Sequence, residues 1–263
     1  MDNRPIGVLD SGLGGLTVLK KVIEKLPNES TIFIGDQAHM PYGDRSEEEI
    51  IKLTRASVNF LLKQDVKLII FGCNTATAVA MQKIQKEVPV QLIGVIQSGA
   101  LAASQKTRNK KVAVLGTTVT QESHAYQKEI QARDAEIQVK EYAEPLWAPL
   151  VESNPEEEKK IEVVKEGLAE IKDQDFDTLI LGCTHYPLLT KEIRANLAPS
   201  KQILDPADQV ATYTYNVLKR DNMLAQGPAK YEYYTTAANT AKFNQIARNW
   251  MEDATIESKH VND

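Results

Sequence analysis

Cysteine and histidine are scarce in this chain, which has two cysteines and four histidines among 263 residues. Two cysteines cannot build the disulfide framework of a small secreted protein, so we expect both thiols to be free in a reducing cytoplasm. The Cys-x₂-Cys spacing that is typical of structural zinc sites does not occur. The sequence therefore predicts neither a disulfide scaffold nor a metal site.

Long apolar runs and an excess of positive charge are also missing. No stretch approaches the roughly 18 apolar residues of a membrane span. Met1–Pro5 leads straight into a strand-like segment, without the apolar core of a signal peptide. The formal net charge of −5 argues against broad binding to a phosphate backbone. We therefore expect a cytoplasmic protein with neither nucleic-acid nor membrane partners.

Short apolar runs instead alternate with amphipathic helical patterns along the whole chain. This alternation is typical of βαβ units and a mostly parallel sheet. Ser46 followed by Glu49 predicts a capped helix, and Asn154 before Pro155 predicts another, with its buried stripe at Ile161, Val164, Leu168 and Ile171. The predicted strands are Ile6–Asp10, Thr31–Gly35, Val66–Phe71, Gln91–Val95, Lys111–Leu115, Ile137–Glu141 and Thr178–Leu181.

A weak internal duplication is the most informative feature. Leu68–Thr75 (LIIFGCNT) recurs as Thr178–His185 (TLILGCTH), so that the two cysteines lie 183 − 73 = 110 residues apart. Upstream, Ile6–Asp10 (IGVLD) has a counterpart in Val112–Gly116 (VAVLG). Each half thus carries a strand, a loop, a helix and a later strand that ends in Gly-Cys.

The duplication predicts an α/β protein with two similar domains, each a mostly parallel sheet flanked by helices, and an active site in the cleft between them. The length also suggests about two domains. Residues 1–97 with 208–263 should form the first domain, which carries Cys73, and residues 98–207 the second, which carries Cys183. The reason is that the duplicated unit restarts near Lys111, whereas the C-terminal tail looks helical, with no sheet of its own.

Both cysteines follow strand ends, where ligands bind in open α/β sheets. Free cysteine is more often a small buried apolar residue than a reactive one. Here, however, the only two cysteines occupy matching positions of a duplicated unit, and amide, hydroxyl or imidazole side chains follow them: Asn74, Thr75, Thr184 and His185. This pattern favours a functional pair over two packing residues.

Two opposed thiols suit the inversion of a stereocentre. The reaction removes a proton from one face of a carbon and delivers another to the opposite face. A thiolate and a thiol supply both roles, because the reference thiol pKa of about 8.5 is close to neutrality. Cys73 and Cys183 are therefore the candidate catalytic bases.

Carboxylates follow two other predicted strands, at Asp10 and Asp36. The segment from Asp10 to Gly15 resembles a dinucleotide-binding loop, but the third glycine of that motif is replaced by Thr17. The two carboxylates better suit a substrate ammonium group or a partner that tunes a catalytic group. Helix capping and turn formation remain the alternative roles.

Six segments together resemble the glutamate racemases of the aspartate/glutamate racemase family. They are Asp10–Thr17 (DSGLGGLT), Gly35–Gly43 (GDQAHMPYG), Cys73–Thr77 (CNTAT), Gly116–Thr120 (GTTVT), Pro149–Glu152 (PLVE) and Gly182–Pro187 (GCTHYP), with a weaker match near Tyr234–Thr236.

The resemblance implies a cofactor-independent interconversion of L- and D-glutamate that supplies D-glutamate for peptidoglycan, in a homodimer. It implies that Cys73 takes the proton from D-glutamate and Cys183 from L-glutamate. Asp10, Asp36, Glu152 and His185 would assist at the catalytic centre. The substrate would be lined by Asp10, Ser11, Tyr42, Gly43, Asn74, Thr75, Thr184 and His185, with Thr117 and Thr120 as further carboxylate contacts.

The chain departs from the family pattern at Glu144-Pro145, where Cys-Pro is common, and at Gln97-Ser98, where Glu-Pro is frequent. Three alternatives remain open. They are a related two-cysteine racemase for aspartate or another amino acid, a non-catalytic amino-acid-binding protein, and a redox protein with a Cys73–Cys183 disulfide.

Overall fold

The computed structural model describes residues 1–261 and divides into two compact units. Unit 1 comprises Met1–Val95 and the segment from Ala207 onward, and unit 2 comprises Ile96–Pro206. The expected divisions at 97/98 and 207/208 lie within two residues of these limits. Within residues 1–261, none of the helices combines the length and the apolar character needed to cross a bilayer.

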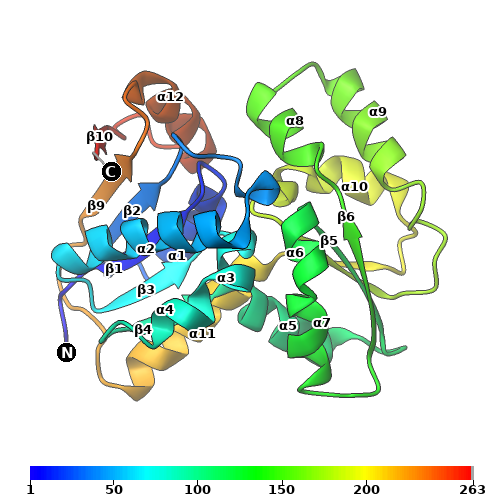
Figure 1. The fold of residues 1–263 in the computed structure, drawn as a ribbon, viewed down its shortest axis with the longest axis horizontal. Helices are drawn as coiled ribbons and strands as arrows, with labels where there is room; N and C mark the ends of the chain where they lie inside the picture. The colour runs from blue at the N-terminus through cyan, green and yellow to red at the C-terminus, as the bar shows by residue number, and fades with distance from the viewer. Residues whose placement is uncertain (262–263) are drawn as a thin grey trace. The chain divides into compact units, whose positions relative to one another are not determined.

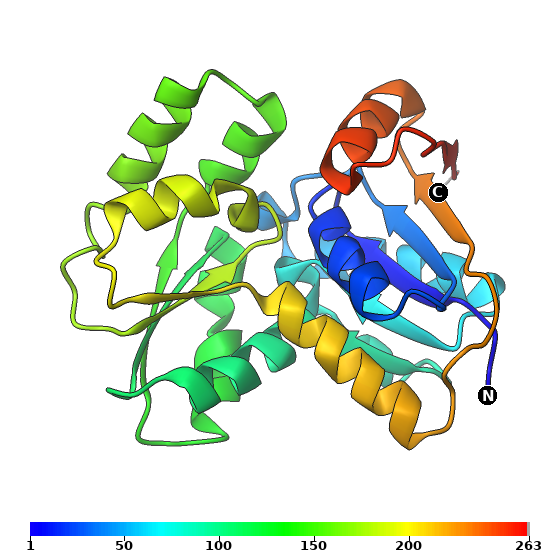
Figure 2. The ribbon, with the colours of Figure 1, turned by 180° about the vertical axis from the view of Figure 1, so that it is seen from behind.

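Unit 1 contains a six-stranded sheet in the order β10-β9-β2-β1-β3-β4, in which all neighbouring strands are parallel. Helices cover both faces: α2–α4 lie on the side facing the viewer in Figure 1, and α1, α11 and α12 on the side facing the viewer in Figure 2. The strands are β1 (Ile6–Asp10), β2 (Thr31–Gly35), β3 (Leu68–Phe71), β4 (Gln91–Gly94), β9 (Tyr231–Thr235) and β10 (Ser258–His260). The helices are α1 (Gly15–Lys25), the 3₁₀ helix η1 (Tyr42–Asp44), α2 (Glu47–Lys63), α3 (Asn74–Val79), α4 (Met81–Gln85), α11 (Pro206–Arg220) and α12 (Thr240–Met251).

Unit 2 contains a four-stranded parallel sheet in the order β6-β5-β7-β8. Helices α6 and α7 pack on β5 and β6, whereas α9 packs against α8 and α10. The strands are β5 (Lys111–Gly116), β6 (Gln138–Ala143), β7 (Thr178–Gly182) and β8 (Gln202–Leu204). The helices are α5 (Val95–Lys106), α6 (Thr118–Ser123), α7 (Ala125–Gln131), α8 (Trp147–Ser153), α9 (Glu157–Gly167), the 3₁₀ helix η2 (Tyr186–Leu189) and α10 (Thr190–Asn196).

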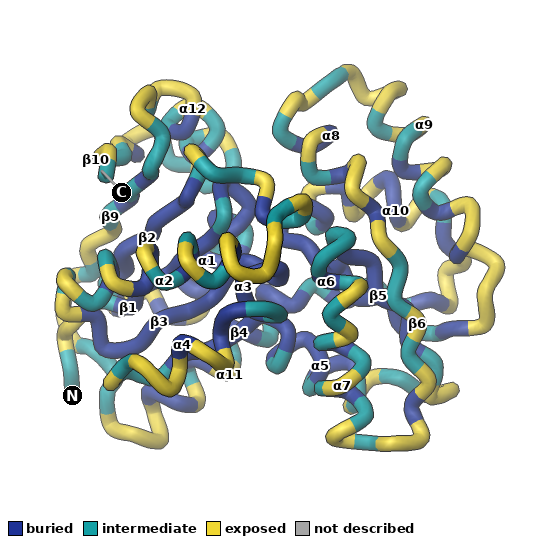
Figure 3. The backbone as a smooth tube through the Cα atoms, in the orientation of Figure 1, coloured by how far each residue is buried: buried dark blue, intermediate teal, exposed yellow. Residues whose placement is uncertain are grey.

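The two sheets share one topology, as the internal duplication predicts. The order β2-β1-β3-β4 of unit 1 matches β6-β5-β7-β8 of unit 2, with each strand in the same place along the chain. The central strands form the cores: every residue of β1, β3 and β7 is buried, and β1 and β3 are dark blue in Figure 3. Near-continuous apolar strands are what a sheet covered on both faces requires.

The sequence predicted a helical C-terminal tail with no sheet of its own, but the tail also contains strands β9 and β10. β9 pairs in parallel with β2, and β10 pairs with β9, so the tail extends the sheet of unit 1. Its first strand, Tyr231–Thr235, is rich in the aromatic and β-branched residues that favour strands, but only Tyr233 and Thr235 are buried. The weak burial explains why no apolar run marked it.

The capping box at Ser46 and Glu49 is confirmed at the start of α2. The predicted cap at Asn154 is wrong, because Asn154 ends α8 in a left-handed conformation with φ 43°, and α9 begins at Glu157. Asparagine is one of the few residues that tolerate this conformation. Of the predicted stripe, Ile161 is 44% exposed, whereas Val164, Leu168 and Ile171 are buried.

Candidate active site

Cys73 lies at the first turn after β3 and caps helix α3. Its Sγ accepts a hydrogen bond from the Ala76 N–H at 3.4 Å, and the thiol lies 3.5 Å from the hydroxyl oxygen of Ser11. Asn74 and Thr75 are the first residues of α3 and are buried. A sulfur at a helix N-terminus faces backbone N–H groups, an arrangement that stabilises a thiolate.

Asp10 is the last residue of β1, which pairs with β3, the strand that leads to Cys73. One carboxylate oxygen accepts the Gly12 N–H at 3.0 Å, so Asp10 shapes the Ser11–Gly12 turn that presents Ser11 to the thiol. The side chain is buried, with 2% of its surface exposed. Asp10 therefore has the turn-forming role that was the alternative for this residue, and its strand lies beside the one that leads to Cys73.

Asp36 follows β2 and is the centre of a buried hydrogen-bond network. Its carboxylate accepts the Tyr42 hydroxyl at 2.6 Å and the Thr236 hydroxyl at 2.7 Å, and lies 2.8 Å from His39 Nδ1. Burial raises the pKa of Tyr42, and the charges of Asp36, Cys73 and Asp10 raise it further. Tyr42 therefore stays a neutral hydroxyl donor and links the Asp36 network electrostatically to Cys73.

Cys183 lies directly after β7 and has an imidazole beside it. Its Sγ is 3.8 Å from His185 Nδ1, and His185 Nε2 is 2.9 Å from Glu152 Oε1 on α8. Burial alone would lower the pKa of His185, but the hydrogen bonds to Cys183 and Glu152 outweigh it and raise that pKa to about 10. At neutral pH the imidazole is therefore positively charged, and it lies beside the Cys183 sulfur.

The remaining predicted binding residues follow strand ends or lie in the short helices next to them. Thr117 caps α6 just after β5, accepting the Thr120 N–H at 3.3 Å, and Gly116 of β5 pairs with Gly182 of β7. Thr184 is buried between Cys183 and His185. Gly43 lies in η1 beside Tyr42. Within each unit, the predicted residues thus gather at the carboxyl edge of one sheet.

The glycine before each cysteine is needed for close approach rather than for backbone freedom. Neither Gly72 nor Gly182 has a positive φ. A Cβ on Gly182 would lie 2.7 Å from the Leu115 carbonyl oxygen, and one on Gly72 would lie 3.1 Å from that of Leu9. Each glycine lets the strand that carries the cysteine pack tightly against its neighbour.

Sequence reasoning assigned no role to three residues that contact the predicted ones. His39 and Thr236 bind Asp36, and the Tyr186 N–H donates to the carbonyl oxygen of Cys183 at 3.1 Å. The first and third lie inside quoted motifs and could have been proposed from them. Thr236 lies 200 residues from Asp36 in the chain, so only tertiary structure brings the two together.

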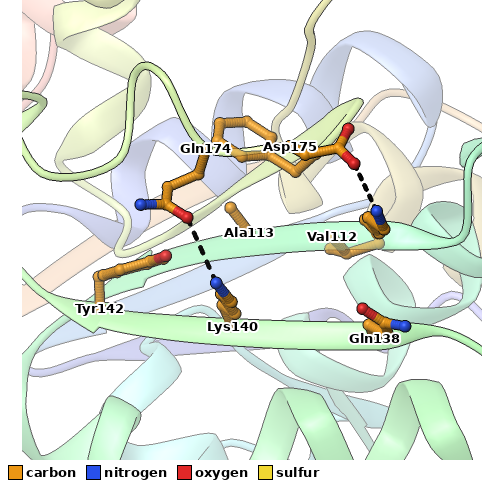
Figure 4. Close-up of a pocket in the computed structure, with 9 residues that line it drawn as sticks. Val112, Ala113, Gln138, Lys140, Tyr142, Gln174 and Asp175 are labelled. Atoms are coloured by element: carbon orange, nitrogen blue, oxygen red, sulfur yellow. Dashed lines mark hydrogen bonds and ion pairs between the residues drawn. The ribbon is translucent and has the colours of Figure 1, made fainter.

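Each unit also has a surface pocket, of which only the one in unit 1 includes a predicted site residue. In unit 1, a pocket of about 270 Å³ lies beside α2 and is lined in part by Asp36, Phe60 and Thr236. In unit 2, a pocket of about 130 Å³ lies near the start of β5, where Lys111 pairs with Asp175 and Lys140 donates to Gln174 at 3.3 Å (Figure 4). No group of three metal-ligating side chains is found among residues 1–261.

The fold and the two Gly-Cys turns define a class of protein: a parallel α/β protein of two similar units, each with a buried cysteine at a strand end that forms no disulfide. Residues 6–214 match the family model for Asp/Glu/hydantoin racemases. The chain therefore belongs to the Asp/Glu/hydantoin racemase family of isomerases.

Individual relatives agree with this assignment. The chain is 66% identical over 263 residues to the glutamate racemase of Lactobacillus johnsonii, covering 99% of this chain and 98% of the relative. The crystal structure of a glutamate racemase isoform from Bacillus anthracis aligns with TM-score 0.96 at 36% identity, over 100% of this chain and 98% of that one. A Francisella tularensis glutamate racemase in complex with D-glutamate aligns with TM-score 0.91 at 32% identity, over the same shares.

Proposed function

We propose that this protein interconverts L- and D-glutamate, using Cys73 and Cys183 as two acid–base groups at the α-carbon. The observation that carries the proposal is the matched position of the two thiols. Each is buried outside any disulfide, and each lies at the end of the third strand of the same sheet topology in its own unit. A packing role for cysteine does not account for this repetition. The similarity to glutamate racemases supports glutamate as the substrate.

With L-glutamate, the Cys183 thiolate removes the α-proton and becomes a thiol, leaving a carbanion stabilised by the adjacent carboxylate. The Cys73 thiol then delivers its proton to the opposite face and becomes a thiolate. With D-glutamate the two roles reverse. One proton is taken up and one is released in each turnover, so no external oxidant, reductant or cofactor is needed for balance.

Unit 2 supplies a charged partner to its base. The imidazolium of His185, held by Glu152, stabilises the thiolate of Cys183 and orients it through the contact at 3.8 Å. This is the arrangement by which a neighbouring histidine activates a cysteine in other enzymes. Glu152 acts by keeping His185 protonated and fixed.

Unit 1 stabilises its base differently. The Cys73 thiolate accepts the Ala76 N–H at the start of α3 and lies beside the Ser11 hydroxyl, while Asp36 holds Tyr42 nearby. Asp10 offers a carboxylate for the substrate ammonium group. The amide and hydroxyl groups of the strand-end residues suit the two substrate carboxylates, because each donates hydrogen bonds. These binding residues are Ser11, Tyr42, Gly43, Asn74, Thr75, Thr117, Thr120, Thr184 and His185.

The cellular setting follows from the same proposal. The two units act as two domains with one base each, and the free thiols require a reducing compartment, the cytoplasm. The product D-glutamate would serve peptidoglycan synthesis, and we propose a homodimer as the working form.

The decisive experiment is a circular dichroism assay of the purified protein with L- or D-glutamate and no added cofactor. We expect both enantiomers to converge on the racemate, a protein spectrum without cofactor absorbance, and poor turnover of aspartate. Equal or faster racemisation of aspartate would assign the chain to the alternative substrate. Tight binding of glutamate without racemisation would assign it to the non-catalytic class.

A further inference from the structure

Glu144 occupies in unit 2 the position that Asp36 occupies in unit 1. Asp36 directly follows β2, and its N–H donates to the Asp10 carbonyl of β1 at 3.0 Å. Glu144 directly follows β6, and its N–H donates to the Gly116 carbonyl of β5 at 2.8 Å. Each unit therefore places a buried carboxyl group at the same point of its sheet.

The surroundings of Glu144 tie three segments of unit 2 together. Its carboxyl accepts the Leu146 N–H at 3.3 Å, just before α8 begins, and its carbonyl accepts the Tyr186 hydroxyl at 2.5 Å. Trp147, the first residue of α8, packs edge-on against Tyr186, and both rings are fully buried. The start of α8 is thus held by the residue next to His185.

Gly167, the last residue of α9, leaves the space that this arrangement fills. A Cβ on Gly167 would lie 2.3 Å from Glu144 Oε2 and 2.7 Å from Trp147 Nε1. Two polar atoms therefore lie where a methyl group on residue 167 would be, so a side chain added there must displace Glu144, Trp147 or the glycine itself. Burial raises the pKa of Glu144, whereas the Leu146 N–H lowers it.

Helix α8 is consequently fixed to the Cys183 loop at both ends. At its start, Trp147 contacts Tyr186, and one turn and a half later Glu152 contacts His185 at 2.9 Å. A helix of seven residues is about 10 Å long. A displacement of its start is therefore transmitted to Glu152 almost undiminished.

We propose that Glu144, Trp147 and Gly167 form a brace that fixes α8 and thereby holds Glu152 against His185, making Glu144 and Gly167 positioning residues for proton transfer at Cys183. The inference rests on the proposed function, because it acts through the His185–Glu152 pair. It accounts for the presence of a carboxyl group where the family pattern commonly has cysteine.

The test is a Gly167→Ala substitution, with Glu166→Ala as a matched control on the exposed side of the same helical turn. Alanine is intrinsically the better helix residue, so a loss must come from the displaced brace. We expect the Gly167→Ala variant to fold, to keep its KM for L-glutamate, and to lose about tenfold in kcat, the effect of weakening about one charge-assisted hydrogen bond. The Glu166→Ala variant should match the unchanged protein.

A double-mutant comparison separates positioning from general damage. In a Glu152→Gln background, Gly167→Ala should cost almost nothing further, since the residue through which it acts is already disabled. An undiminished tenfold loss there would overturn the brace. If Gly167→Ala is silent while Glu152→Gln is impaired, the brace alone fails. If Glu152→Gln leaves kcat unchanged, both the role of the His185–Glu152 pair in the proposed function and the brace are wrong. Racemisation by two thiols is tested separately, by the cysteine variants.

A second pair of variants covers the case in which Gly167→Ala does not fold. The Glu144→Gln variant keeps an acceptor for the Leu146 N–H, so its kcat should stay close to that of the unchanged protein. The Glu144→Ala variant lacks the acceptor, so its kcat should fall while KM stays constant. Equal kcat values in the two Glu144 variants would contradict the proposal.

Discussion

The two thiols occupy equivalent places in two sheets of the same topology, yet their surroundings differ in kind. Cys73 begins a regular helix and accepts a backbone N–H, with hydroxyl and carboxylate groups nearby. Cys183 is followed by a 3₁₀ turn and has a charged histidine beside it, which a glutamate holds from another helix. The same chemistry can therefore be supported by a helix terminus in one unit and by an ion pair in the other.

The largest effect should come from removing either thiol. General acid–base catalysis by one residue is worth about 10²–10⁴ in rate. Cys73→Ala and Cys183→Ala should therefore each slow racemisation by at least that factor, and both variants should remain folded. Cys73→Ala should still exchange the α-proton of L-glutamate with solvent deuterium, and Cys183→Ala that of D-glutamate. Mass spectrometry of recovered glutamate reads both outcomes, and near-normal racemisation in either folded variant would falsify the two-thiol mechanism.

The supporting groups should differ in how strongly they affect their own thiol. Because L- and D-glutamate have equal free energies, any variant must change kcat/KM by the same factor for both enantiomers. The effect of a supporting group on one thiol must therefore be measured as α-proton exchange in a protein that keeps only that thiol. In the Cys73→Ala background, Glu152→Gln should slow exchange from L-glutamate by about 10–100-fold, since a charge-assisted hydrogen bond is worth about 1.5–3 kcal/mol.

The matched substitution in unit 1 is Asp36→Asn in the Cys183→Ala background, followed by exchange from D-glutamate. We expect a smaller loss of about fivefold, equivalent to about 1 kcal/mol, because Asp36 acts on Cys73 through Tyr42. A larger loss for Asp36→Asn than for Glu152→Gln would reverse the order that we infer for the two units.

The charged histidine should also give unit 2 a distinctive pH dependence of stability. The folded-state pKa of His185 is raised from 6.5 to about 10, so its contribution is fully present below pH 6.5 and is lost as pH rises toward 10. Urea unfolding at several pH values should show this decline, and the decline should be smaller in a His185→Asn variant. Identical slopes for the two proteins would show that His185 is not charged in the folded state.

The smallest expected difference concerns helix capping. Because Cys73 caps α3 and Cys183 caps no regular helix, Cys73→Ala should lose about 0.5 kcal/mol more stability than Cys183→Ala. Cys73→Ser should recover that difference, since serine is a good N-cap. Thermal unfolding of the three variants provides the comparison, and a greater loss in Cys183→Ala would contradict it.

The sequence predicted strands β1 to β7 within two residues at each end. Most of them are buried apolar runs, although β6 is an edge strand with no buried residue. The prediction failed for β8, β9 and β10, because these strands are short or half-exposed and lack continuous apolar runs. The cap at Asn154 failed because the same residue type favours both a helix start and a left-handed helix end.

The site shows the same division. A repeated local pattern sufficed to single out Cys73, Cys183 and the polar residues that follow them, because parallel strands bring their carboxyl ends to one edge. Partners supplied by distant segments were beyond that local pattern. Thr236, which reaches Asp36 across 200 residues, was not predicted, and Glu152, which reaches His185 from a helix 33 residues upstream, was named only through the family resemblance.

The sequence by itself thus determined the duplicated α/β architecture and the two candidate bases, since apolar periodicity and motif spacing are local properties of a chain. Only the tertiary structure decided which polar groups surround each thiol, and that His185 carries a raised pKa. It also revealed the packing of Glu144 and Trp147 above Gly167. The physical reason is that burial, charge and close contact depend on segments that meet only when the sheets have formed.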